Sequence, residues 1–269
     1  ILDGIHEART QGADLVTFPE LAVPGYPPED LIFKPQFVRE NRQWLDRVVE
    51  ATAGITAVVG FVDGAGGKIH NAAPIAHDGE LVGIYHKILL PTYGVFDEDR
   101  YFVPGDACPV YVINGTAVGV NICEDIWYGA CPTVVQSAAG AEVIVNINAS
   151  PYYSGKREFR ERMVATRASD NEVYVSYTNM VGGQDELVFD GGSMVFDQKG
   201  ELVARGKQFE EDLVIIDLDL DAGTAEVVKG WKVPLRPFFG ILGVCPPEGM
   251  GAIPSNPPYL HGGNLDNKE

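Results

Sequence analysis

The sequence has few cysteines, little positive charge and no long apolar run. No stretch approaches the roughly 18 consecutive apolar residues of a membrane-spanning helix. No basic segment followed by an apolar one opens the chain, which argues against a secretory signal. Lys and Arg number 20 against 38 Asp and Glu in 269 residues, giving a net charge of −18. Because binding to a polyanion needs clustered basic residues, we expect association with neither nucleic acid nor a membrane.

The cysteines are Cys108, Cys123, Cys131 and Cys245. They form no CxxC pair, and no His stands at zinc-ligand spacing from any of them, so we expect no metal site. With 45% hydrophobic residues, the chain can bury a large core without a disulfide framework. This composition fits a reducing, cytoplasmic setting. Each cysteine is therefore first interpreted as a buried thiol.

Both ends of the sequence predict a piece of a longer protein. Residues 1–11 have the apolar spacing of a helix, and the strand that should precede it in an α/β domain is expected to be missing. From about residue 233, Pro and Gly become frequent and the periodicity disappears. We expect one domain over residues 1–232 and an irregular tail or linker over 233–269.

Apolar runs alternate with amphipathic segments along this domain. Helices are expected at 1–11, 37–53, 133–140 and 156–171, and strands at 14–18, 55–62, 117–122, 142–147, 173–178, 193–196, 201–204 and 213–218. Asp78-Gly79 lies between two further runs, 71–76 and 80–85, and predicts a hairpin. Hairpins do not suit a doubly wound parallel sheet. The expected fold is an α/β, four-layer αββα sandwich of two mixed sheets flanked by helices.

Three residues that can do chemistry stand at or near strand ends. Cys123 follows a strand where the chain turns toward a helix, a position close to free backbone N–H groups. Glu20 ends a buried strand, where desolvation raises a carboxyl pKa toward that of a general base. Lys87 lies in an apolar run and could stabilise an oxyanion or a thiolate. Each also has a plain structural interpretation: a buried thiol, a helix-capping glutamate and a lysine whose ammonium reaches solvent.

Together, these segments resemble the nitrilase, or carbon–nitrogen hydrolase, superfamily. The resemblance covers residues 1–220 and rests on PELxxxGY at 19–26, HKxxLP at 86–91 and a strand ending in NICED at 121–125. It implies an αββα sandwich in which Glu20 is the base, Lys87 stabilises the oxyanion and Cys123 is the nucleophile. The backbone N–H of Glu124 is the implied second oxyanion donor.

Longer matches resemble the glutaminase domain of glutamine-dependent NAD synthetase. They are ELAVPGYPPEDL at 20–31, KILLPTYGVFDE at 87–98 and NASP at 148–151, followed by Gly155-Lys156. This resemblance implies glutamine as the substrate, a role beside the triad for Glu98, no cofactor for the hydrolysis, and a homo-oligomer. Contacts with the substrate are implied for five residues: Tyr26, Tyr93, Trp127, Ser150 and Lys156.

One part of that family is missing from the sequence. It contains no Ser-Gly-Gly-x-Asp-Ser pyrophosphatase loop. The conversion of deamido-NAD to NAD with ATP and magnesium is therefore expected in another domain, which would receive the ammonia. The implied glutaminase reaction passes through a thioester on Cys123. Two alternatives stay open: a stand-alone amidase acting on another small amide or carbamoyl compound, and an inactive assembly domain.

Overall fold

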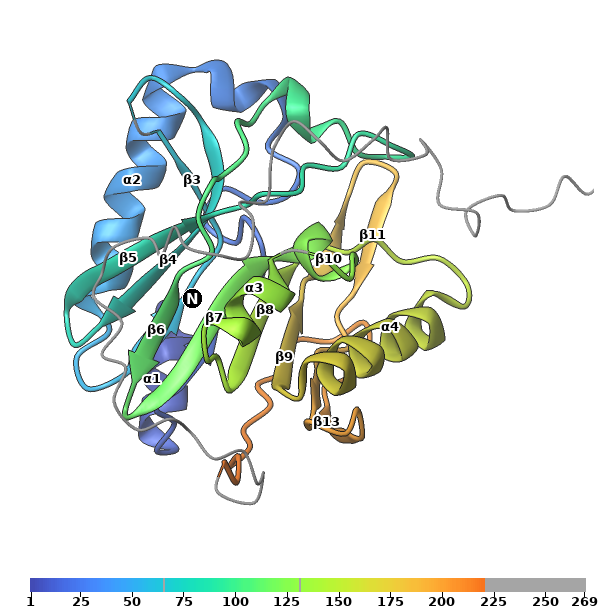
Figure 1. The fold of residues 1–269 in the computed structure, drawn as a ribbon. Helices are drawn as coiled ribbons and strands as arrows, with labels where there is room; N and C mark the ends of the chain where they lie inside the picture. Colours follow the sequence, from blue (N-terminus) through green and yellow to red (C-terminus); the bar gives the residue numbers. More distant parts are fainter. Residues whose placement is uncertain (65, 131, 221–269) are drawn as a thin grey trace, which may run out of the picture.

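Two mixed β-sheets lie face to face and carry helices on their outer sides (Figure 1). The structure is a computed structural model that describes residues 1–64, 66–130 and 132–220. The expected four-layer αββα sandwich is confirmed. The expected domain boundary at 232 and the irregular segment 233–269 lie outside the described residues.

The first sheet contains five strands. Their order is β1-β2-β4-β3, with β5 paired to β4. β1 and β2 are parallel, and the other pairs are antiparallel. Asp78 and Gly79 both have positive φ between β4 and β5, so the hairpin forms where Asp-Gly predicts it. The strand bounds are β1 Leu15–Thr17, β2 Thr56–Val58, β3 Phe61–Asp63, β4 His70–His77 and β5 Glu80–His86.

The second sheet contains six strands in the order β13-β12-β9-β8-β7-β6. β7, β8 and β9 are parallel to one another, and the outer pairs are antiparallel. β10 (Val181–Gln184) and β11 (Leu187–Asp190) form a separate antiparallel hairpin. The strand bounds in this sheet are β6 Val110–Ile113, β7 Thr116–Ile122, β8 Val143–Asn148, β9 Tyr174–Asn179, β12 Met194–Phe196 and β13 Leu202–Arg205.

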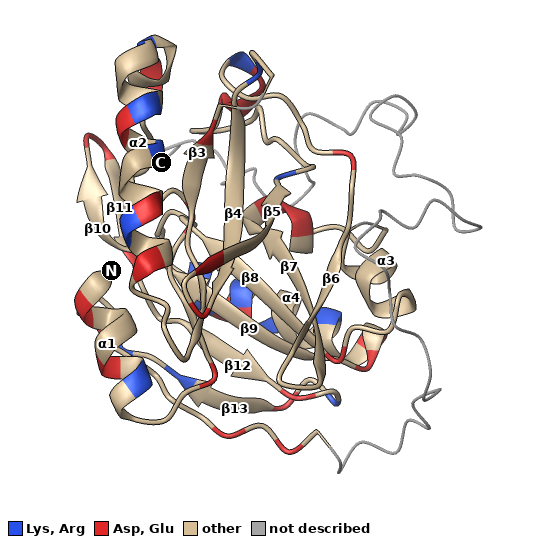
Figure 2. Cartoon of the chain, turned by 90° about the vertical axis from the view of Figure 1, so that its left-hand side faces the viewer, with Lys and Arg blue, Asp and Glu red and all other residues tan. Residues whose placement is uncertain are grey.

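Helices cover the outer face of each sheet. α1 (Leu2–Thr10) and α2 (Pro35–Glu50) pack on the first sheet, and α3 (Thr133–Ala138) and α4 (Lys156–Asn171) on the second. Acidic and basic residues follow one another along the outer turns of α1 and α2 (Figure 2). Short 3₁₀ helices form at η1 Glu29–Phe33, η2 Glu98–Arg100 and η3 Cys123–Ile126.

The main core lies between the sheets. Side chains from the two sheets meet there, among them Val58, Ile75, Val120, Val145 and Ile147. β8 is buried along its whole length because one face meets the other sheet and the second face meets the helices. A strand covered on both faces needs apolar residues at successive positions, which explains the run of Val143, Ile144 and Val145; the buried Asn146 of the same strand is hydrogen-bonded to Asn121.

Several expectations about single elements are wrong. The run 213–218, expected to be a strand, pairs with no other strand; Leu218 instead packs on the inter-sheet core without a backbone ladder. The run 55–62 forms two strands, because Val59 and Gly60 interrupt the strand conformation. The strand β6 and the hairpin of β10 and β11 were not expected. β10 contains Gly182-Gly183 and is mostly exposed, so it has no alternating apolar pattern to detect.

Gly60 stands at the break between β2 and β3 and lies against the segment that carries Glu20. Its N–H donates to the carbonyl of Pro19 at 3.1 Å, and its carbonyl accepts from the N–H of Val23 at 3.0 Å. A Cβ at position 60 would stand 2.1 Å from the Leu21 nitrogen and 2.4 Å from the Pro19 oxygen. Since both are backbone atoms, only glycine allows this approach.

Gly60→Ala should therefore destabilise the protein by at least about 2 kcal/mol, because a methyl group there displaces backbone rather than a mobile side chain. The free energy of unfolding in urea measures the change. Gly129→Ala is the matched control, since its Cβ would meet only the Arg167 guanidinium at 3.7 Å or more, and should change stability by less than about 0.5 kcal/mol. Equal stabilities for the two variants would contradict the close-approach argument.

Candidate active site

Glu20, Lys87 and Cys123 meet between the two sheets. Glu20 follows β1 and Lys87 follows β5, both in the first sheet, and Cys123 follows β7 in the second. Their exposed fractions are 0%, 1% and 4%. The fold therefore brings together, in a dry environment, three polar residues of which the first and last are more than 100 positions apart in the sequence.

Hydrogen bonds hold the Glu20 carboxylate at both oxygens. Oε1 accepts from Lys87 Nζ at 2.7 Å and from Asn71 Nδ2 at 2.7 Å. Oε2 accepts from the backbone N–H of Ala149 at 2.9 Å. Three donors fix the plane of the carboxylate, as a general base requires if it is to meet its proton in a set direction.

Lys87 joins Glu20 to a second buried acid, Glu98. Its Nζ donates to Glu98 Oε1 at 2.8 Å, and the same oxygen accepts from Tyr26 Oη at 3.1 Å. Burial alone lowers the pKa of Lys87, but the two carboxylates raise it, and the net pKa lies well above the usual value. Lys87 is thus a cation. Burial raises the pKa of Glu98 to about 7 against the opposing effect of Lys87, so Glu98 can gain or lose a proton near neutral pH.

Cys123 occupies a strained turn at the end of β7. Its φ is +44°, a left-handed conformation that costs a residue with a Cβ about 1–2 kcal/mol. The residue opens η3, and the first N–H groups of such a helix, here including that of Glu124, have no partner within the helix. Burial raises the pKa of the Cys123 thiol well above its usual value, Glu20 raises it further, and Lys87 lowers it. The sulfur therefore keeps its proton until a base removes it.

Two of the expected substrate-contacting residues are already paired with acids. Tyr93 Oη lies 2.8 and 2.9 Å from the two carboxylate oxygens of Glu124. Tyr26, expected to contact the substrate, contacts Glu98. Tyr26 and Glu98 also line a small cavity of about 40 Å³. Both tyrosines thus adjoin the triad, through acids that flank it.

Lys156 and Trp127 lie together on the α4 side of the site. The Lys156 ammonium stands 4.4 Å from the Trp127 ring centroid, and the rings of Tyr153 and Phe159 lie at 5.0 and 5.7 Å. Burial lowers the pKa of Lys156 to about 8. A half-desolvated cation among aromatic rings is suited to an anionic group that replaces its lost water.

Ser150 is 2% exposed and follows β8. Its backbone N–H donates to Asn179 Oδ1 at 3.0 Å. The preceding residue, Ala149, donates to Glu20. The Asn148–Ser150 segment is therefore anchored on one side to the candidate base and on the other to β9, which places Ser150 next to the triad.

Two residues with structural roles at this site were missed in the sequence. Asn71 donates to Glu20 through its side chain, and its carbonyl accepts from the Lys87 N–H at 2.8 Å. Asp125 is fully buried and accepts hydrogen bonds from the chain on both sides of the site. Asp125 is the last residue of the NICED motif and Asn71 lies in β4 outside any motif, and the contacts of both depend on the pairing of distant strands.

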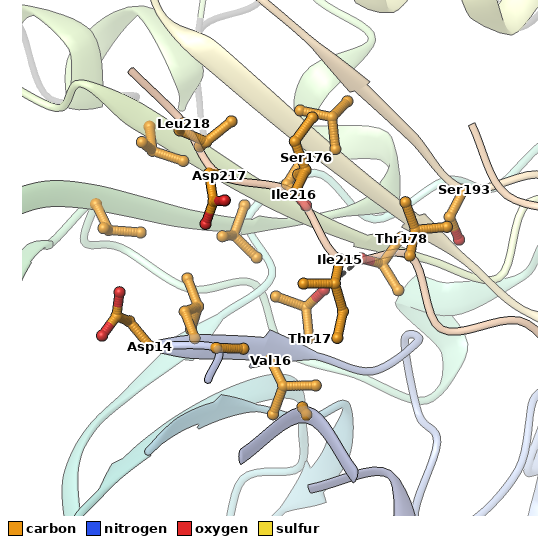
Figure 3. Close-up of a pocket in the computed structure, with 18 of the residues that line it drawn as sticks. Asp14, Val16, Thr17, Ser176, Thr178, Ser193, Ile215, Ile216, Asp217 and Leu218 are labelled. Atoms are coloured by element: carbon orange, nitrogen blue, oxygen red, sulfur yellow. Dashed lines mark hydrogen bonds between the residues drawn. The ribbon is translucent and has the colours of Figure 1, made fainter. Parts of the chain in front are cut away.

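A larger cavity lies away from these residues. It has a volume of about 390 Å³ and opens at the free edge of β1, between Asp14–Thr17, Ser176–Thr178 and 212–218 (Figure 3). Glu20, Lys87 and Cys123 do not line it. Its walls are mostly aliphatic and lack an acid–base pair with a nucleophile, so the candidate chemistry stays with the smaller, buried site.

Within residues 1–64, 66–130 and 132–220, no three His, Cys, Asp or Glu side chains are grouped closely enough to hold a metal ion. In the same part of the chain, no helix has both the length and the apolar character needed to cross a bilayer.

Solved structures share the fold of this chain. The glutamine-dependent NAD⁺ synthetase from Acinetobacter baumannii, in complex with ADP, aligns with a TM-score of 0.77 and 37% identity, over 82% of this chain and 42% of that one. The NitN amidase from Nesterenkonia sp. AN1 aligns with a TM-score of 0.72 and 27% identity, over 82% of this chain and 86% of the amidase.

Sequence comparison also finds glutamine-dependent NAD synthetases among the similar proteins. The chain is 48% identical over 223 residues to the glutamine-dependent NAD(+) synthetase of Thermotoga maritima, a match covering 82% of this chain and 38% of the relative. It therefore spans about two fifths of that relative's length. The family model for carbon-nitrogen hydrolase matches residues 1–225. The resemblance inferred from the sequence motifs is confirmed, and the chain belongs to the carbon–nitrogen hydrolase family.

Proposed function

We propose that this chain is a glutamine amidohydrolase that forms a thioester on Cys123 and supplies ammonia to an ATP-dependent NAD synthetase. The observation that carries the proposal is a buried series of ion pairs, in which Lys87 joins Glu20 to Glu98, next to a thiol on a strained turn. The relatives' names support glutamine as the amide and NAD synthesis as the destination of the ammonia.

Acylation begins with proton transfer from Cys123 to Glu20. The sulfur attacks the side-chain amide carbon, and the carbonyl electron pair moves onto oxygen. Lys87 and the backbone N–H of Glu124 stabilise this oxyanion; removing one such donor usually costs about 100- to 1,000-fold in kcat. The C–N bond then breaks, Glu20 returns the proton to nitrogen, and ammonia leaves a thioester on Cys123.

Deacylation uses the same groups in reverse order. Glu20 takes a proton from water, the resulting hydroxide adds to the thioester carbon, and the C–S bond breaks with return of the proton to sulfur. Glutamate is released. Glu98 keeps Lys87 oriented, and because it can hold a proton near pH 7, it limits the negative charge in a site that already contains Glu20. No metal or organic cofactor takes part in this half-reaction.

The amino acid head group of glutamine is assigned to Ser150 and Lys156, with Tyr93 and Tyr26 along the pocket and Trp127 as an aromatic wall. Lys156 is the cation best placed for the α-carboxylate, because burial among aromatic rings has removed much of its water. Ser150 adjoins the base through Ala149, so one substrate can reach both residues and the sulfur.

A stand-alone amidase for another small amide is the second candidate. It is favoured by the alignment over 86% of the Nesterenkonia amidase, a protein of similar length. Ammonia release from glutamine beside asparagine, acetamide and propionamide separates the two candidates. A preference for glutamine supports the first, and a preference for a simple aliphatic amide overturns it.

Three further features belong to the proposal. ATP and magnesium would act in a synthetase domain that receives the ammonia, in line with the longer relatives. A cytoplasmic location suits a mechanism that needs a reduced thiol. Association into a homo-oligomer would bring several glutaminase sites into one assembly.

Cys123→Ala and Glu20→Gln should each abolish ammonia release from glutamine, and the double variant should be little worse than either single one. Groups that act as a unit fail together rather than additively. Steady-state rates of ammonia release are measured for the original protein, the two single variants and the double variant. Cys108→Ala is the control and should keep its activity. Strictly multiplicative losses would show that the two residues do not cooperate.

Ser150→Ala should lower kcat/KM for glutamine about ten- to a hundredfold, chiefly through KM, because one hydrogen bond to a charged head group is lost. Acetamide lacks that head group and should be unaffected. If kcat/KM falls equally for glutamine and acetamide, or changes for neither, the head-group pocket has been assigned to the wrong residues.

The KM for glutamine should rise as the pH passes above about 8, because burial lowers the pKa of Lys156 to that value and the lysine loses its charge. Lys156→Arg keeps its charge throughout this range and should remove the alkaline rise. The KM for acetamide should not follow the same profile. A rise that persists in Lys156→Arg would assign the titration to another group.

A further inference from the structure

Asp125 receives hydrogen bonds from two separate segments of the site. Its Oδ1 accepts from the backbone N–H groups of Ile88 and Leu89, at 3.2 and 2.8 Å. Its Oδ2 accepts from the N–H of Ile122 at 3.0 Å and from Tyr85 Oη at 2.8 Å. The side chain is fully buried, so these four donors replace its water.

The segments joined by Asp125 carry two members of the triad that lie on different sheets. Ile88 and Leu89 follow Lys87 directly, and Ile122 precedes Cys123 directly. Lys87 belongs to the end of β5 in one sheet and Cys123 to the end of β7 in the other. One carboxylate therefore sets the separation between the ammonium that stabilises charge and the sulfur that attacks.

The contact with Ile122 also bears on the strained turn. Asp125 is the third residue of η3, and its carboxylate reaches back to the N–H before the first residue, as in half of a capping box. Cys123 lies between these two bonded positions with its φ at +44°. A left-handed cysteine persists only where its surroundings hold it, and this bond spans the strained residue from one side to the other.

We propose that Asp125 is the positioning residue of the active site, which holds the Cys123 turn in register with Lys87 through its bond to the Ile122 N–H. The proposal rests on Cys123 being the nucleophile. It assigns no contact with substrate to Asp125, whose oxygens are already engaged by the protein itself.

Asp125→Asn tests this role selectively. The Asn oxygen can still accept from Ile88 and Leu89, which can only donate. Its NH₂ group then faces Tyr85 and the Ile122 N–H. The Tyr85 hydroxyl can rotate and accept a hydrogen bond from this group, but the Ile122 N–H can only donate. The variant keeps three of the four contacts and replaces the fourth by two opposed donors. It therefore detaches the Cys123 turn from the Lys87 segment, and it also removes the carboxylate charge.

Two measurements on the full chain follow from the proposal. The rate at which iodoacetamide alkylates Cys123, mapped by mass spectrometry, should fall about tenfold at neutral pH, equal to a rise of one unit in thiol pKa. In the glutaminase assay kcat should fall about ten- to a hundredfold, with KM within about threefold of the original, because substrate contacts remain.

The alkylation rate distinguishes positioning from charge. Removing a buried negative charge favours the thiolate and would speed alkylation, whereas loss of alignment with Lys87 slows it. Faster or unchanged alkylation of Cys123 in a folded Asp125→Asn protein overturns the proposal. Because this readout needs no substrate, it stands even if glutamine is the wrong amide; absence of glutamine turnover in the original protein would overturn only the proposed function.

Two further variants complete the test. Glu142→Gln is the matched control, since Glu142 accepts from the Ala117 N–H at 3.0 Å near the opposite end of β7, and it should leave both rates unchanged. Tyr85→Phe removes one donor from Oδ2 and should slow alkylation about threefold, roughly the effect of one weakened hydrogen bond. If Asp125→Asn does not fold, a natively folded Tyr85→Phe protein with an unchanged or faster rate overturns the proposal.

Discussion

The Lys87 ammonium, shared between the buried carboxylates of Glu20 and Glu98, is the interaction on which the rest of the site depends. Three ionisable groups are removed from water in this site, and burying the charge of any one of them alone would be unfavourable. The ammonium lies 2.7 Å from Glu20 and 2.8 Å from Glu98, so opposite charges offset one another. The arrangement keeps Lys87 charged, orients Glu20 and raises the pKa of Glu98 to about 7.

The sandwich architecture explains why such a cluster can exist. Strand ends are where side chains leave a packed sheet, and two sheets placed face to face bring the ends of β1, β5, β7 and β8 to one buried location. Gly60 lets β2 and β3 pass against the backbone at Glu20. The apolar residues between the sheets exclude water, which strengthens each charged hydrogen bond in the site.

Much of this was predictable from local sequence. The Asp-Gly turn, the buried run of β8 and the bounds of α4 follow from periodicity and turn chemistry, and the motifs around residues 20, 87 and 123 identify the family. The failures have a common cause. The run 213–218 has strand-like alternation without a partner strand, and β10 pairs with β11 despite a sequence rich in glycine. Strand pairing is decided by neighbours that a local pattern does not contain.

The sequence by itself determined which residues are chemically able to act: one thiol after a core strand, one glutamate after another and one lysine in an apolar run. Only the tertiary structure decided that these groups lie together, that Asn71 and Asp125 support them, and that Tyr26 and Tyr93 engage acids beside the triad. The physical reason is that protonation and direction depend on burial and on donors several strands away. Those donors are set by the packing of two sheets rather than by the order of residues along the chain.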